Sequence, residues 1–120
     1  MGTEGGGNHL QDAAGIVVTL TDPKPDPTRA SYGLDCRSVN WYGMLYHFSP
    51  TQAACVKVLI EHYKHGVPEL GESTILTSEW VDSSQQRLAS VFDNGRHLAW
   101  GTMIKPGSTK GTFRLAKPGE

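Results

Sequence analysis

The residue types best suited to metal binding or nucleophilic catalysis in this chain are Cys36, Cys55, His62 and His65. His62 and His65 are three positions apart, so on a helix they would share a face, and Cys55 would lie two turns before His62. A structural zinc site needs a fourth ligand, and the sequence suggests none and has no C-x-x-C motif. A nucleophilic cysteine would need a histidine base and an orienting partner, and no such signature is present. We therefore expect no catalytic residue, no metal site and no cofactor.

A second group of polar residues has the chemistry to recognise nucleic acid. Residues 83–86 form an S-x-x-Q capping box, and Leu88, Val91 and Phe92 would form the inward stripe of a helix that ends at residues 94–95. The opposite face of this helix would carry Gln86, Arg87, Ser90, Asp93 and Asn94. Such amide, guanidinium and hydroxyl groups can bind base edges or phosphates. An ordinary solvated polar face is the alternative interpretation.

A basic hairpin is predicted after this helix. Residues 99–104 and 112–115 have strand character, and the Gly/Ser/Thr-rich segment between them favours a turn. Lys105 and Lys110 flank that turn, so both could reach phosphates, although lysines in a turn also simply increase solubility. The full set of residues expected to contact DNA is Ser84, Gln86, Arg87, Ser90, Asn94, Arg96, Lys105, Ser108, Thr109, Lys110 and Arg114.

The charge of the chain is distributed unevenly. The 120 residues carry a net charge of −1, but residues 1–36 sum to −3, whereas residues 83–117 have six basic residues against Asp93 alone and sum to +5. A basic segment of this kind predicts a localised anion-binding face. The length allows one small domain, no apolar run could span a membrane, and two cysteines cannot form a disulfide scaffold. We therefore expect a cytoplasmic protein.

The elements that would position these residues begin after a Gly/Pro-rich segment. Residues 1–35 are expected to be a flexible leader, residues 36–117 the folded domain and residues 118–120 a tail. Within the leader, the β-branched residues 16–20 could form one strand, which would need to add to the edge of a downstream sheet.

The predicted domain has five elements. Residues 38–41 and 44–48 form a hairpin, and Ser49-Pro50-Thr51-Gln52 starts a helix that Gly66 and Pro68 end. A short helix follows over residues 71–78, and then the third helix and the basic hairpin. The expected core residues are Phe48, Val56, Leu59, Ile60, Ile75, Leu76, Leu88, Val91, Phe92, Trp100, Ile104 and Phe113.

This order of elements is similar to a winged helix-turn-helix domain, and most similar to the effector domains of OmpR-like response regulators, without their receiver domain. Phe48-Ser49-Pro50-Thr51-Gln52 resembles the L-T-x-x-E start of the first helix, and Lys110-Gly111-Thr112-Phe113-Arg114-Leu115 resembles the G-x-G-Y-R-L wing strand. The resemblance covers about residues 38–116. It implies an α+β fold with a three-helix core, an N-terminal β-hairpin and a C-terminal β-hairpin wing.

The same resemblance implies a function. The third helix would enter the major groove and the wing would lie on the phosphate backbone, in a small bacterial transcriptional regulator or mobile-element component. The alternative is a winged helix used for protein–protein contact without nucleic acid, which Asp93 and the nearly neutral total charge favour. The partners considered are double-stranded DNA, a second copy of the chain and another protein, with no membrane.

Overall fold

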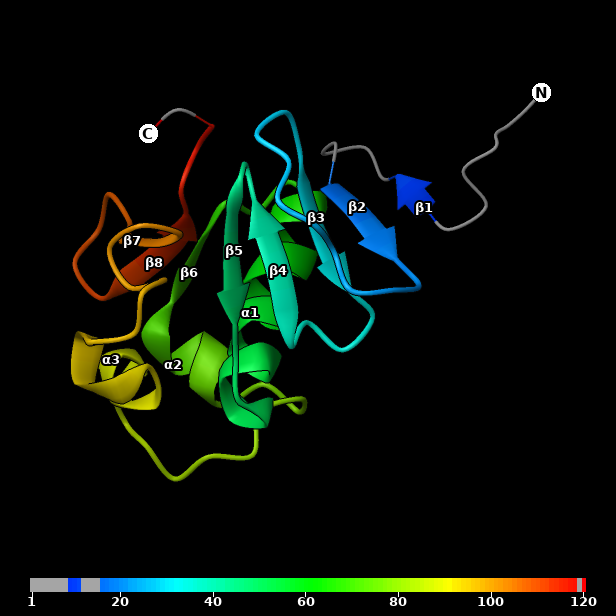
Figure 1. The fold of residues 1–120 in the computed structure, drawn as a ribbon. Coiled ribbons are helices and arrows are strands. Elements are labelled where there is room, and N and C mark those ends of the chain that lie inside the picture. Colours follow the sequence, from blue (N-terminus) through cyan, green and yellow to red (C-terminus); the bar gives the residue numbers. More distant parts are fainter. Residues whose placement is uncertain (1–8, 12–15, 119) are drawn as a thin grey trace.

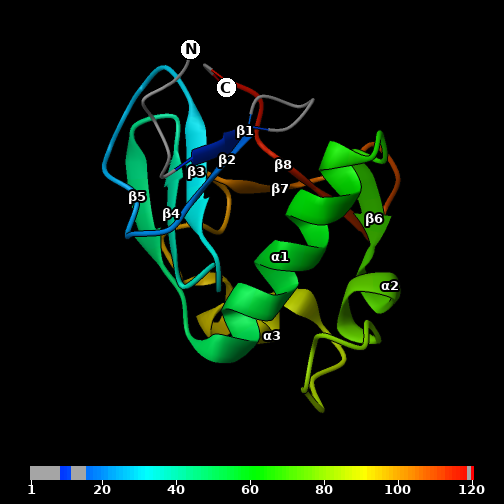
Figure 2. The same ribbon diagram turned by 90° about the vertical axis from the view of Figure 1, so that its right-hand side faces the viewer.

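The computed structural model describes residues 9–11, 16–118 and 120, which form two β-sheets and one long helix, α1 (Pro50–Lys64). Helix α1 covers one face of the first sheet, and the second sheet packs beside the same helix (Figures 1 and 2). The first sheet consists of β1 (His9–Gln11), β2 (Ile16–Thr19), β3 (Ala30–Gly33), β4 (Ser38–Trp41) and β5 (Met44–His47), in that spatial order. The second sheet consists of β6 (Glu69–Gly71), β8 (Thr112–Leu115) and β7 (Ile104–Pro106), in that order.

The β4–β5 hairpin lies where the sequence predicts it. Trp41 pairs with Met44, so Tyr42 and Gly43 form a two-residue turn. Both turn residues have positive φ, 51° and 101°, which matches the right-handed twist of the two strands. The prediction of this hairpin is confirmed.

The start of α1 is also as predicted. Ser49 Oγ accepts a hydrogen bond from the Gln52 N–H, and Gln52 Oε1 accepts one from the Ser49 N–H, so both halves of the capping box form. Pro50 occupies the first turn, where its missing N–H removes no intrahelical bond. At the other end Gly66 adopts a φ of +84°, which ends the helix.

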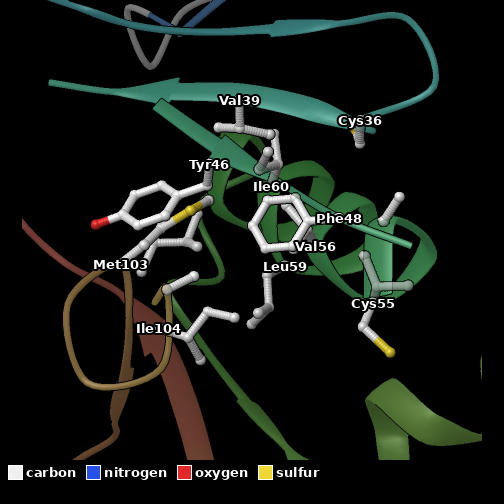
Figure 3. Packing of buried hydrophobic residues seen from close by; sticks show 14 of the residues in the cluster. Cys36, Val39, Tyr46, Phe48, Cys55, Val56, Leu59, Ile60, Met103 and Ile104 are labelled. Carbon is white, nitrogen blue, oxygen red and sulfur yellow. The ribbon is translucent and has the colours of Figure 1, made fainter. Parts of the chain in front are cut away.

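One hydrophobic core joins both sheets to α1. Val39 and Tyr46 from the first sheet, Leu59 and Ile60 from α1, and Ile104 from the second sheet all point into it (Figure 3). Of the twelve expected core residues, nine are buried, and Val91, Trp100 and Phe113 are half-buried against the cluster. The core prediction therefore holds although the arrangement of helices does not.

The predicted winged helix-turn-helix fold, with its three-helix core, is wrong. The structure is a small α+β domain with a single long helix, because α2 (Glu72–Leu76) has five residues and α3 (Leu88–Val91) has four. The polar face predicted on a third helix over residues 83–95 therefore has no helix to carry it.

Local hydrogen bonds explain why α3 is so short. The Ser83 hydroxyl accepts from the Gln85 N–H in a local turn, and the Leu88 N–H donates to a carboxylate oxygen of Glu72 on α2 at 2.7 Å. At its C-terminal end, Asp93 and Asn94 both have left-handed backbone conformations, with φ of 58° and 56°. Tertiary contact with α2 thus fixes the start of α3, and a left-handed turn ends it.

Part of the segment expected to be a flexible leader lies inside the first sheet. Strand β2 pairs in parallel with β3, and Ile16 and Ala30 are completely buried. Residues 16–19 and 30–33 of the predicted leader are therefore strands of this sheet, and of the two possibilities kept for residues 16–20 the strand that joins a sheet is confirmed. Residues 1–8 and 12–15 lie outside the described part of the chain.

A buried asparagine fixes the connection between these two parallel strands. Asn40 has no exposed surface, and its amide donates to the backbone carbonyls of Asp26 and Arg29 at 3.2 and 3.0 Å. Its side-chain oxygen accepts from the N–H groups of Asp26 and Gly43 at 3.1 and 2.9 Å. The Pro-rich connection is therefore bound to the sheet and to the β4–β5 turn.

Candidate nucleic-acid interface

The β7–β8 hairpin is the best preserved part of the predicted DNA-binding surface. Strand β7 is shorter than predicted, because residues 99 and 101–103 form turns and Trp100 makes only an isolated bridge to Ile104. Lys105 and Pro106, predicted as turn residues, belong to the strand. The cross-strand register places Glu69, Arg114 and Lys105 in one row across the second sheet. Two cations and one carboxylate therefore share one face.

Arg114 is not free to bind a phosphate. Its guanidinium forms two hydrogen bonds with the carboxylate of Glu120, at 2.8 and 2.5 Å. This guanidinium lowers the pKa of Glu120 to about 2, so the carboxylate stays ionised at neutral pH. Arg114, one of the residues predicted to contact DNA, is thus paired within the chain.

A second carboxylate lies at the tip of the hairpin. Glu69 Oε1 accepts hydrogen bonds from the Ser108 N–H at 3.0 Å and from the Ser108 hydroxyl at 2.8 Å. These two bonds lower the pKa of Glu69. Ser108, another residue predicted to contact DNA, therefore donates its hydroxyl and its N–H to a carboxylate of the same chain.

The remaining tip residues are open. Lys110 is exposed, forms no ion pair with a described residue and lies between Thr109 and Gly111. No described group accepts a hydrogen bond from the N–H of residue 109, 110 or 111. Gly111 has a φ of +84° and open space around its Cα. The tip thus presents a lysine and three backbone donors to solvent.

The residues predicted to read bases do not form one surface. Gln86 and Arg87 are exposed in the irregular segment before α3, and Arg87 lies 3.9 Å from Glu72. Ser90 is half-buried on α3, and Asn94 is exposed in the left-handed turn. Ser84 and Arg96 are also exposed, outside any helix or strand. The structure therefore leaves these side chains without a common helical face.

Folding places acidic residues from elsewhere in the sequence next to the basic segment, residues 83–117. Glu72 is next to Arg87, Glu120 is next to Arg114, and Glu69 caps the hairpin tip. Within residues 83–117, the cations without an ion pair to a described residue are Arg96, Lys105, Lys110 and Lys117. Of these four, Lys117 is the one absent from the predicted DNA contacts, although it lies two residues after the predicted wing strand.

The cysteine and histidine residues are structurally engaged. Burial raises the pKa of both Cys36 and Cys55 to about 12, which disfavours the thiolate. His62 and His65 form hydrogen bonds through Nδ1 to the carbonyls of the residues four positions earlier in α1. Among the described residues, no group of three His, Cys, Asp or Glu side chains is placed to hold a metal ion.

The sequence analysis missed the role of His97. Its Nδ1 accepts from the Ala99 N–H at 3.0 Å, so the proton must be on Nε2, which donates to the His47 carbonyl at 2.8 Å. The ring stacks on Phe48 with centroids 5.0 Å apart. His97 therefore attaches the turn before β7 to the end of β5.

No helix within the described ranges has the length and apolar character needed to cross a membrane. Comparisons of the chain with protein-family models, curated proteins and solved structures gave no match. The function is therefore argued from the geometry of the chain.

Proposed function

We propose that the protein binds double-stranded DNA through the phosphate backbone, with the tip of the β7–β8 hairpin as the main contact. The observation that carries the proposal is the combination of exposed Lys110 with three unengaged backbone N–H groups at residues 109–111. Lysine and backbone N–H groups are donors that bind phosphate oxygens irrespective of the base sequence.

Further cations of the basic segment could add phosphate contacts. Lys105 and Lys117 lie on the same hairpin and the residues after it, and Arg96 lies in the turns before β7. The carboxylates of Glu69 and Glu120 reduce the net charge of this surface, so we expect modest affinity that falls steeply with salt.

The proposal differs from helix-based recognition in its sequence dependence. Gln86 and Arg87 lie in an irregular exposed segment, and no helix presents them to a groove. Gln86→Ala should therefore have only a small effect on DNA affinity, and the effect should be the same for every duplex sequence. A cytoplasmic location is part of the proposal, supported by the two free, buried cysteines, which suit a reducing compartment.

The test is a salt titration of binding to a fluorescently labelled random-sequence duplex, followed by anisotropy. Lys110→Ala should weaken binding and reduce the slope of log K against log salt by about 0.9, the value for one lost phosphate contact. Lys24→Ala is the matched control, because Lys24 is also exposed and has no ion pair with a described residue but lies on the connection between β2 and β3.

Two results would contradict the proposal. One is an equal salt slope for Lys110→Ala and Lys24→Ala, which would remove the hairpin tip from the interface. The other is the absence of duplex binding by the wild-type protein at low salt, which would favour a protein-interaction module instead.

A further inference from the structure

Two exposed leucines lie side by side at one end of the parallel strand pair. Thr19 at the end of β2 pairs with Gly33 at the end of β3, so the next residues, Leu20 and Leu34, are neighbours. Their exposed fractions are 62% and 61%, high for large apolar side chains. Both strands end on the right-hand side of Figure 1, at about mid-height, on the opposite side of the molecule from the β7–β8 hairpin, and Figure 2 agrees with this placement.

Both leucines line an open cavity of about 240 Å³ at the surface. Its other lining residues are Thr19, Thr21, Asp22, Gly33 and Asp35. This volume can hold one aliphatic side chain of a partner, with the leucines as its apolar walls. The remaining groups at its edge are hydroxyls and carboxylates.

The two charged residues that line the cavity are both acidic. Asp22 and Asp35 are both exposed, and Asp35 is held in place because one of its oxygens accepts from the Arg37 N–H at 3.0 Å. The nearby Arg37 guanidinium donates to the Phe48 carbonyl at 2.6 Å, which occupies its Nε. A second copy of the chain docking by the same face would bring like carboxylates together, which opposes self-association.

We propose that Leu20, Leu34, Asp22 and Asp35 form a docking surface for a cationic, amphipathic segment of another protein. An apolar side chain of the partner would enter the cavity lined by the leucines, and lysine or arginine side chains beside it would pair with the two carboxylates. The surface is far from the hairpin tip, so partner binding and DNA binding can occur together. The inference therefore stands independently of the proposed function.

The probe is a short amphipathic helical peptide with leucines at i, i+3, i+4 and i+7 and lysines elsewhere, titrated into the full chain. Its counterpart with glutamates in place of the lysines tests the charge requirement. Binding is measured by anisotropy, and the contact surface by amide chemical shifts of the labelled protein. Chemical shifts of the wild-type protein locate the site even where a variant is unstable.

We expect the lysine peptide to bind, to shift the amides around residues 20–22 and 33–35, and to lose affinity about tenfold or more in Leu20→Ser/Leu34→Ser. Leu98→Ser is the matched control, because Leu98 is 78% exposed and lies in the turns before β7. Asp22→Asn/Asp35→Asn should also weaken binding, and the glutamate peptide should not bind.

Three results would overturn this proposal. They are undetectable binding of the lysine peptide at millimolar concentration, equal losses in the leucine pair and in Leu98→Ser, and shifts confined to other surfaces. Duplex binding by Leu20→Ser/Leu34→Ser should equal that of the wild type, so failure here leaves the DNA proposal to its own test.

Discussion

Asn40→Ala tests how the connection between β2 and β3 is held. The Asn40 side chain makes four hydrogen bonds of 2.9–3.2 Å to backbone groups of Asp26, Arg29 and Gly43. A typical intramolecular hydrogen bond contributes about 0.5–1.5 kcal/mol net, so loss of all four should lower the free energy of unfolding by about 2–6 kcal/mol. That is a large share of the roughly 5–15 kcal/mol that stabilises a small domain.

The measurement is urea unfolding followed by tryptophan fluorescence, with Gln86→Ala as the control. Gln86 is exposed and makes no side-chain hydrogen bond to a described residue, so its replacement should change the stability by less than about 0.5 kcal/mol. Hydrogen exchange adds a local readout, because the amides of Asp26 and Gly43 should exchange faster in Asn40→Ala. A loss of stability below about 1 kcal/mol, with unchanged exchange at both amides, would refute the proposed role of Asn40.

Three further predictions concern the core and the hairpin. Leu59 is 2% exposed, and Leu59→Ala should lower the free energy of unfolding by about 2–5 kcal/mol; an unchanged thermal midpoint would contradict its place in the core. A Cβ at Gly107 would collide with Thr112 Oγ1, so Gly107→Ala should destabilise the protein by about 1–3 kcal/mol, and adding Thr112→Ala should recover part of the loss. Because the folded-state pKa of Glu120 is lowered to about 2, its pairing with Arg114 stabilises the protein above about pH 4.5 and is lost as the pH falls towards 2. The difference between the unfolding curves of the wild type and Glu120→Gln should therefore shrink as the pH falls from 4.5 towards 2, and a difference of undiminished size at pH 2 would count against this pairing.

The parts of the fold that the sequence predicted well are local. The capping box at Ser49 and the two-residue turn at Tyr42-Gly43 involve groups within a few positions of each other, and both form as expected. The core residues were also identified, since burial follows side-chain chemistry even where the elements are arranged differently.

The failures have a common physical origin in long-range contacts. The Ser83 hydroxyl, predicted to cap a helix, accepts a hydrogen bond within a local turn instead. Helix α3 begins five residues later, where the Leu88 N–H donates to Glu72, sixteen residues earlier in the sequence. The sequence indicates no partner for the strand at residues 16–19, because its parallel pairing with β3 depends on a ten-residue connection that Asn40 holds from a third strand.

The sequence by itself determined which residues form the core, the position of the long helix α1, the β4–β5 hairpin and the basic character of residues 83–117. Only the tertiary structure decided how much of that charge is available. Three carboxylates lie before or after the basic segment in the sequence but contact it in the fold. Glu69 binds Ser108, Glu72 lies beside Arg87, and Glu120 pairs with Arg114. Electrostatic interaction depends on distance in space, not on separation along the chain, so the summed charge of a segment does not give the charge of the surface it forms.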